Sequence, residues 1–346
     1  MVSANHDIIW ISNPTLFKEL IMTKSKQLLS VAISASALLF SISGANAAGF
    51  YIQEQSVKGL GAAFSGSATS IDDASTIFFN PAGMTKLDGM QGNLGVHLLI
   101  PDADLTDNGS NNVLGRPVGE NPDNPYDPTP VPNAYFAAPL ELGGNLFWAG
   151  IGISAPFGLS SDYGETSFVR FDSTETELRT INVAPSAAFA INDMISIGGG
   201  VDIQYADAEL KSIVSNGVTE GPSTLEGDDI SVGYNLGVQF KPRTDTEIGL
   251  HYRSAISHTL EGNIKVENVA GLNFDESGSA DLDLPDIATL GIAHDVTDRF
   301  RVMGQATWFG WSNFKEIQAV RDDGVAVPNV EQDYQNTYAI AIGAEY

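Results

Sequence analysis

The sequence predicts an all-β fold, a transmembrane antiparallel β-barrel, and three observations support this prediction. From Gly92 onward, apolar and polar residues alternate with a period of two, which is typical of strands. The connections between these segments alternate between short turns and long polar loops. The chain also carries an export signal but no later stretch apolar enough for a spanning helix, so the exported chain must be either soluble or a barrel.

The clearest alternation runs from Ile230 to Phe240. Its apolar face consists of Ile230, Val232, Tyr234, Leu236, Val238 and Phe240, and its polar face of Ser231, Gly233, Asn235, Gly237 and Gln239. The same pattern, in places weaker, predicts ten strands in all. They lie at residues 93–100, 134–140, 147–157, 181–191, 196–205, 230–240, 246–254, 287–294, 300–309 and 338–346.

A soluble β-sandwich would alternate in the same way, with its apolar face turned to a core. Two features favour the membrane barrel instead. The polar faces hold small uncharged residues, mainly Gly, Ser, Asn, Gln and Ala, as expected of a lumen. Aromatic residues near the strand ends resemble the girdles at the two membrane interfaces: Phe147, Phe157, Phe189, Tyr205, Tyr234, Phe240, Tyr252, Phe300 and Trp308.

The lengths of the connections predict which end of the barrel faces outward. Short turns lie at residues 142–145, 192–193, 242–245 and 296–298, and long polar segments at 102–131, 158–177, 212–229, 262–285 and 312–336. If the first strand runs outward, every long segment falls outside and every short turn inside. Short periplasmic turns and long external loops are the arrangement of outer-membrane barrels.

The N-terminus carries the export signal. We interpret residues 1–21 as an upstream extension, with translation starting at Met22. Residues 22–47 contain a basic stretch, an apolar stretch from Leu28 to Ile42 and the small-residue cleavage motif Ala45-Asn46-Ala47, so the mature chain is expected to begin at Ala48. A transmembrane anchor is the alternative, but the apolar run is short and interrupted by serine.

The composition excludes several classes of function. The formal net charge is −26, whereas a nucleic-acid-binding surface needs Lys and Arg, so we expect no nucleic-acid partner. The chain has no G-x-S-x-G motif, and its histidines lack the spacing of a metal site. Acidic pairs such as Asp102 and Asp104 lack the Gly and distal Glu of an EF-hand loop. We therefore expect neither an enzyme nor a bound cofactor or metal.

The segment from Ala48 to Asp88 is rich in Gly, Ala and Ser and does not read as a strand. It contains Ala48-Gly49-Phe50 at the expected mature terminus, then Gly59-Leu60-Gly61, Asp72-Asp73-Ala74 and Asn80-Pro81-Ala82. On these motifs the chain resembles the FadL/TodX-type transporters of the bacterial outer membrane. The resemblance implies that residues 48–90 form a hatch, or plug, in the lumen and that residues 91–346 form the barrel.

The resemblance also implies roles for residues of this hatch. Its large apolar side chains would line a ligand pocket or pack the hatch into the lumen; among them are Phe50, Leu60, Phe64, Phe78 and Phe79. Phe50 is the member that can move most easily, because a terminal segment moves at small cost. Asn80, Pro81 and Ala82 are expected to hold the conformation of the hatch, since proline fixes φ and an Asn side chain can cap a turn.

The third predicted strand ends in Pro156, Phe157 and Gly158. Proline removes a ladder donor and glycine weakens pairing, so a simple strand end at the rim would explain this sequence. The resemblance implies instead a kink that opens a lateral gap in the wall. An apolar ligand could leave through such a gap into the bilayer, which the hydrophobic effect favours over release into water.

In the family, basic residues hold the carboxylate of a fatty acid. Here, alignment places Asp207 and Gln318 near the expected basic positions, which leaves room for a neutral or aromatic ligand. The candidate head-group contacts are therefore Arg253, Lys211 and Lys315. Arg253 lies on the polar face of its strand, where it could pair with a lumen acid instead.

Taken together, the resemblance implies passive, hatch-gated uptake of a hydrophobic small molecule, either a fatty acid or an aromatic or alkane hydrocarbon. We expect a monomer surrounded by outer-membrane lipid. Because family members have fourteen strands and this sequence predicts ten, we expect it to stop before the last strands of the family; a true ten-strand barrel is the alternative. The rival function is a structural or adhesive outer-membrane barrel that transports nothing.

Overall fold

The computed structural model describes residues 49–111, 118–325 and 330–346. The predicted upstream extension, signal peptide and cleavage site, at residues 1–47, lie outside the described residues and stay predictions.

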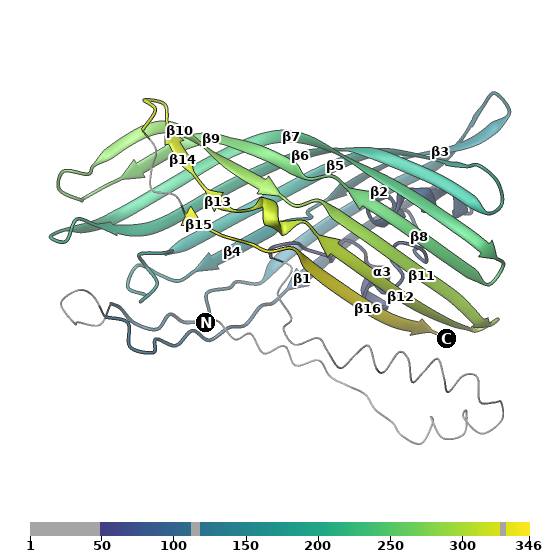
Figure 1. The fold of residues 1–346 in the computed structure, drawn as a ribbon, viewed down its shortest axis with the longest axis horizontal. Helices are drawn as coiled ribbons and strands as arrows, with labels where there is room; N and C mark the ends of the chain where they lie inside the picture. The colour runs from purple at the N-terminus through teal and green to yellow at the C-terminus, as the bar shows by residue number, and fades with distance from the viewer. Residues whose placement is uncertain (1–48, 112–117, 326–329) are drawn as a thin grey trace, which may run out of the picture. The chain divides into compact units, whose positions relative to one another are not determined.

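Ten strands form one continuous antiparallel order, and they correspond to the ten strands predicted from the alternation (Figure 1). In this order they are β1 (Gln91–Leu99), β2 (Thr129–Leu142), β3 (Asn145–Ser154), β5 (Glu175–Ala190), β6 (Ile195–Ser215), β7 (Glu220–Arg243), β8 (Thr246–Arg253), β11 (Ile287–Thr297), β12 (Phe300–Phe309) and β16 (Thr337–Glu345). β1 and β16 are the two edges, and no ladder between them occurs among the described residues.

The prediction of long loops is wrong for three segments. Residues 158–177 contain β4 (Gly158–Asp162), which pairs with β5. Residues 212–229 contain the ends of β6 and β7, which stay paired as far as Ser215 and Glu220. Residues 262–285 contain the end of β9 (Ile256–Val266) and all of β10 (Phe274–Leu284), which pair with each other. These segments hold many polar and charged residues, which led to the prediction of loops. Alternation is nevertheless present on β10, where Ala280, Leu282 and Leu284 are buried and the residues between them are not.

Smaller elements complete this end of the sheet. They are η2 (Trp311–Asn313), β13 (Glu316–Ile317), β14 (Ala319–Arg321) and β15 (Val330–Glu331). β14 pairs with β10, whereas β13 and β15 pair with each other as a separate sheet.

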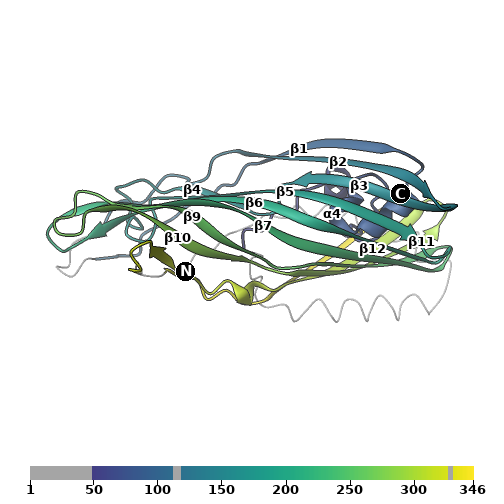
Figure 2. The same cartoon turned by 90° about the horizontal axis from the view of Figure 1, so that it is seen from above.

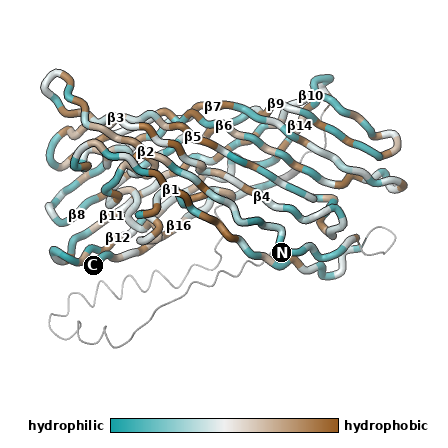
Figure 3. Tube along the Cα trace, turned by 180° about the vertical axis from the view of Figure 1, so that it is seen from behind, coloured by the Kyte–Doolittle hydropathy of each residue, from teal (hydrophilic) through white to brown (hydrophobic). Residues whose placement is uncertain are grey.

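The polarity of the sheet is inverted relative to a soluble protein. On β7, the apolar residues Ile230 and Leu236 are 66% and 56% exposed, whereas the polar residues Asn235 and Gln239 are 0% and 4% exposed. Figure 3 shows the hydrophilic and hydrophobic residues alternating along the strands. The apolar face therefore points outward and the polar face inward, which confirms the barrel over the sandwich. Within the described residues, no helix is long and apolar enough to span a membrane.

Residues 49–90 lie against the inner face of the sheet. They contain α3 (Val57–Gly61), α4 (Thr76–Phe79) and η1 (Pro81–Lys86). Figure 2 shows this segment, in purple, between β2 and β3 on one side and β11 and β12 on the other. Glycine on the inner face of β6 allows a close approach: a Cβ on Gly198 would lie 2.5 Å from the Ala82 nitrogen and 2.9 Å from its Cα. Any larger residue at position 198 would push the segment away from the wall.

Candidate functional site

The apolar side chains of the N-terminal segment meet on the inner face of the sheet. Phe64, Phe78 and Phe79 are buried there in one cluster with Tyr135 of β2. The rings of Phe64 and Phe79 stack with their centroids 5.6 Å apart. Leu60, in contrast, is 49% exposed and does not belong to this cluster. The structure thus brings three of the predicted apolar residues together and leaves Leu60 outside.

A single side chain, Asn80, joins this segment to two strands of the wall. Its Nδ2 donates to the carbonyl oxygens of Ala68 at 2.9 Å, Val238 at 3.1 Å and Leu250 at 3.3 Å. Its Oδ1 accepts from the Ala82 N–H at 3.2 Å and so caps η1. Asn80 is fully buried. Val238 belongs to β7 and Leu250 to β8. The Asn80 amide therefore caps η1 and also connects the N-terminal segment to both of these strands.

Phe50 packs in an aromatic cluster with Tyr51, Phe157, Trp311 and Phe314. The ring of Phe50 lies edge-on to Phe157, Trp311 and Phe314, with centroid distances of 6.1, 4.7 and 5.6 Å. Trp311 is fully buried, and its indole N–H has no acceptor among the described residues. A ligand that displaced Phe50 would therefore meet aromatic faces and edges and one unpaired donor.

The wall is interrupted beside this cluster, at the position predicted for the kink. β3 ends at Ser154 rather than at Phe157, and β4 resumes at Gly158. β5 pairs with both pieces, Ser154 with Asn182 and Gly158 with Arg179, so three residues face two across the break. On its other side β3 loses its partner, because the ladder with β2 ends at Ile153.

The start of the described chain fills this break from inside. The Ile52 N–H donates to the Pro156 carbonyl at 2.8 Å, and the Gly158 N–H donates to the Phe50 carbonyl at 3.1 Å. Tyr51 and Phe157 form an antiparallel bridge between these two bonds. Phe157 is buried, and a Cβ on Gly158 would lie 2.9 Å from the Ile52 Cδ1. The predicted kink residues and the predicted mobile residue Phe50 are thus in direct contact.

The three candidate head-group cations lie apart. The Arg253 guanidinium is buried and pairs with the fully buried Asp202, N to O 2.5 Å. It also donates to the Phe78 carbonyl at 3.1 Å and lies 4.7 Å from the centroid of the Phe78 ring. Asn182 and Asn235 donate to the same Asp202 carboxylate at 2.7 and 3.0 Å. Arg253 is therefore engaged by a lumen acid.

Neither lysine lies in the aromatic cluster. Lys211 of β6 forms ion pairs with Glu175 of β5 at 2.8 Å and with Glu209 at 3.0 Å, and all three side chains are partly exposed. Lys315 is exposed and follows Phe314 in the chain. Among residues 49–111, 118–325 and 330–346, no group of three or more His, Asp or Glu side chains is placed to hold a metal ion.

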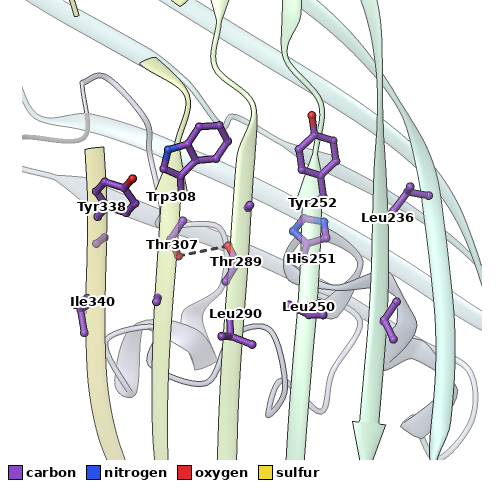
Figure 4. A pocket seen from close by; sticks show the side chains of 14 residues that line it. Leu236, Leu250, His251, Tyr252, Thr289, Leu290, Thr307, Trp308, Tyr338 and Ile340 are labelled. Carbon is purple, nitrogen blue, oxygen red and sulfur yellow. Dashed lines mark hydrogen bonds between the residues drawn. The ribbon is translucent and has the colours of Figure 1, made fainter. Parts of the chain in front are cut away.

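Two hollows differ in size and in side. The inner one, about 30 Å³, lies among Tyr51, Phe78, Phe79 and Arg253 and has room for one water. The larger one, about 610 Å³, crosses β7, β8, β11, β12 and β16 (Figure 4). It is lined by outward apolar residues such as Leu236, Leu250, Leu290 and Ile340. We place the candidate site at the inner hollow, because the larger groove belongs to the exposed apolar face.

Sequence reasoning missed several residues of this site. Trp311, Tyr51 and Gln55 were not predicted as site residues, although Trp311 lies two residues after the end of β12 and Tyr51 adjoins Phe50. Gln55 is fully buried. The only available sign was a pair of glutamines, Gln53 and Gln55, in a segment poor in other polar amides.

The chain matches the family model described as outer membrane protein transport protein (OMPP1/FadL/TodX) over residues 38–346. The long-chain fatty acid transport protein of Escherichia coli O6:H1 is 28% identical, with 97% of this chain and 79% of the relative covered. Outer membrane protein P1 of Haemophilus influenzae is also 28% identical, with 91% and 77% covered.

Solved structures share the fold. A FadL homologue from Pseudomonas aeruginosa superposes with a TM-score of 0.75 at 22% identity, covering 86% of this chain and 77% of that one. The toluene transporter TbuX of Ralstonia pickettii gives a TM-score of 0.61 at 19% identity, covering 82% and 81%. With an inverted antiparallel sheet and a family match over most of its length, the chain belongs to the OMPP1/FadL/TodX family of outer membrane transport proteins.

Proposed function

We propose that the protein takes up hydrophobic compounds passively across the bacterial outer membrane, through a lumen gated by residues 48–90 acting as a hatch. The ligand leaves sideways at the break between β3 and β4. One observation carries this proposal: the segment that occupies the lumen also pairs with the wall at the break, through Tyr51 and Phe157. A single movement of this segment would open both routes.

The inner hollow among the described residues is too small for a ligand, so uptake there requires displacement of the segment. The inner hollow of about 30 Å³ is far smaller than a fatty acid or an aromatic ring. Releasing Phe50 and the two backbone hydrogen bonds beside it costs roughly 3.5–5 kcal/mol, from about 1.5–3 for the ring and about 1 for each bond. An apolar ligand that buries a similar area in the aromatic cluster offsets this cost.

The ligand class follows from the relatives and from the charges of the site. One relative is named as a long-chain fatty acid transport protein and one solved neighbour as a toluene transporter. Here Arg253 is engaged by Asp202, Lys211 is paired with Glu175 and Glu209, and Lys315 is exposed. We propose aromatic or alkane hydrocarbons and long-chain fatty acids as ligands, with the carboxylate of the latter lacking a preformed cation partner.

A reversible crosslink tests the gate. Tyr51 and Phe157 lie between two flanking hydrogen bonds, the arrangement that brings Cα atoms to about 4.5 Å, within disulfide range. The chain has no cysteine of its own. The variant Tyr51→Cys with Phe157→Cys should take up labelled oleate and toluene at least about tenfold more slowly when oxidised, with recovery on reduction.

The control is a second pair inside the wall, Phe147→Cys with Phe189→Cys, which joins paired residues of β3 and β5. Oxidising this pair should leave uptake unchanged. Equal uptake by the oxidised and reduced gate variant would refute gating at the break. No uptake above that of cells lacking the protein, for the unmodified chain, would favour the structural or adhesive barrel.

A further inference from the structure

The break in the wall leaves Ala155, the residue directly after β3, without a strand partner on the β2 side. The β2–β3 ladder ends at Ala134 and Ile153. Continued in the same register, it would bring Asn133 opposite Ser154 and then Pro132 opposite Ala155. Proline has no N–H, and Pro156 follows Ala155 directly, so both chains resist pairing here. The N–H and carbonyl of Ala155 would therefore be left unpaired at the edge of the break.

The side chain of Gln55 pairs with both of these groups. Its Nε2 donates to the Ala155 carbonyl at 2.8 Å, and its Oε1 accepts from the Ala155 N–H at 3.2 Å. A primary amide carries an NH2 donor group and a carbonyl acceptor in one plane, as a peptide group carries its N–H and carbonyl, so it can replace a neighbouring strand at a single residue. Gln55 is fully buried, which makes both bonds costly to leave unmade.

The backbone of Gln55 is held by the opposite side of the break. The Tyr135 hydroxyl, on β2, donates to the Gln55 carbonyl at 2.9 Å. Tyr135 is itself buried. Gln55 thus connects β2, through its main chain, with Ala155 directly after β3, through its side chain, near the place where the two strands stop pairing with each other.

We propose that Gln55 is the positioning residue that holds the lateral break shut, its amide standing in for the missing strand at Ala155. This inference rests on the proposed lateral exit and adds the device that regulates it. Opening requires the amide to leave Ala155 together with the release of Ile52 from Pro156 and of Phe50 from Gly158. Glutamate at position 55 lacks the donor and asparagine is one methylene shorter, so neither reproduces both bonds.

The test is amide hydrogen exchange of the full chain in lipid nanodiscs, with Gln55→Met as the variant. Methionine keeps the length and the apolar contacts but makes neither bond. Exchange at the amides of Ala155, Ile52 and Gly158 should become about tenfold faster, whereas the β6–β7 ladder keeps its protection. Gln53→Met is the matched control, because the Gln53 side chain makes no hydrogen bond among the described residues, and it should leave Ala155 unchanged.

A second variant, Tyr135→Phe, removes the hydrogen bond from the Tyr135 hydroxyl to the Gln55 carbonyl. It keeps the proposal testable if Gln55→Met does not fold. It should accelerate the same three amides by a smaller factor, about fivefold. Unchanged exchange at Ala155 in both variants would overturn the proposal, as would an equal loss of protection in β6 and β7. The three amides could respond as expected while the oxidised gate variant still transports. In that case Gln55 does hold the break closed, but the proposed exit route through the break is wrong.

Discussion

The substitution Asn80→Ala isolates the contribution of one buried amide to the seating of the N-terminal segment. It removes the acceptor that caps η1, which costs about 0.5–2 kcal/mol. It also removes the two Nδ2 hydrogens shared among the carbonyls of Ala68, Val238 and Leu250, at about 0.5–1.5 kcal/mol for each bond. The sum is roughly 1.5–5 kcal/mol. We expect a value near 3 kcal/mol, because the Ala68 carbonyl keeps its bond from Gln239 at 3.3 Å.

The stabilisation lost in Asn80→Ala should appear as local opening of the N-terminal segment rather than as unfolding of the sheet. In nanodiscs, amides of η1 and of the preceding α4 should exchange about 100-fold faster, while those of β6 and β7 change little. Thr85→Ala is the matched control, because its hydroxyl makes a single bond to the wall, to Ser196 Oγ at 2.9 Å. Thr85→Ala should lower the free energy of local opening by about 1 kcal/mol. If Asn80→Ala opened the segment no more than Thr85→Ala, the assignment of Asn80 as the main anchor would be refuted.

Three further predictions concern packing, buried charge and pH. Gly237→Ala should loosen the segment by about 2 kcal/mol or more in the same exchange assay, because the added Cβ overlaps the Asn80 Oδ1; Gly304→Ala, whose nearest neighbour is 3.6 Å away, should be neutral. Arg253→Met should lower the free energy of unfolding by about 3–5 kcal/mol, because it leaves the buried Asp202 carboxylate without its cation. Adding Asp202→Asn should recover most of that loss, and no recovery would contradict the pairing. Hydrogen bonds from the backbone and side chain of Ser110 hold the pKa of the loop residue Asp107 below its ordinary value. The stabilisation that this carboxylate gives its loop is therefore fully present above the pKa of the unfolded chain and is lost as the pH falls through the lower pKa of the folded chain. The Asp107 carboxyl can be titrated by NMR, and a pKa at the ordinary value would disprove this prediction.

The sequence by itself predicted the strands that cross the membrane. Ile230 to Phe240 alternate so regularly that both the strand and its two faces follow from the period of two, and all ten such segments are strands. Pro156 and Gly158 likewise indicated the break in the third strand, because proline cannot donate to a ladder whatever its surroundings. These signals are local, so they survive without knowledge of the neighbours.

The polar strand ends were invisible for a physical reason. From Lys211 to Ser215 on β6, and from Glu220 to Asp228 on β7, the two chains stay paired. Ile213 is buried and Leu225 packs against a small apolar cluster, but few other residues there are apolar, so the period of two is weak. Backbone hydrogen bonds are common to every sequence. Only the pairing of the two chains in space decides that these residues continue the sheet.

The site itself was decided by tertiary structure. The sequence predicted Phe50, Asn80 and Arg253 as site residues, because the residue types and the family motifs were recognisable. It could not indicate that the Asn80 amide reaches Val238 and Leu250, 158 and 170 residues away, or that Gln55 bonds Ala155, 100 residues away. Such partners depend on which strands the segment 49–90 lies against, and an amide side chain fits almost any unpaired peptide group. Local chemistry therefore determined the strands and their break, while the folded sheet alone determined what closes it.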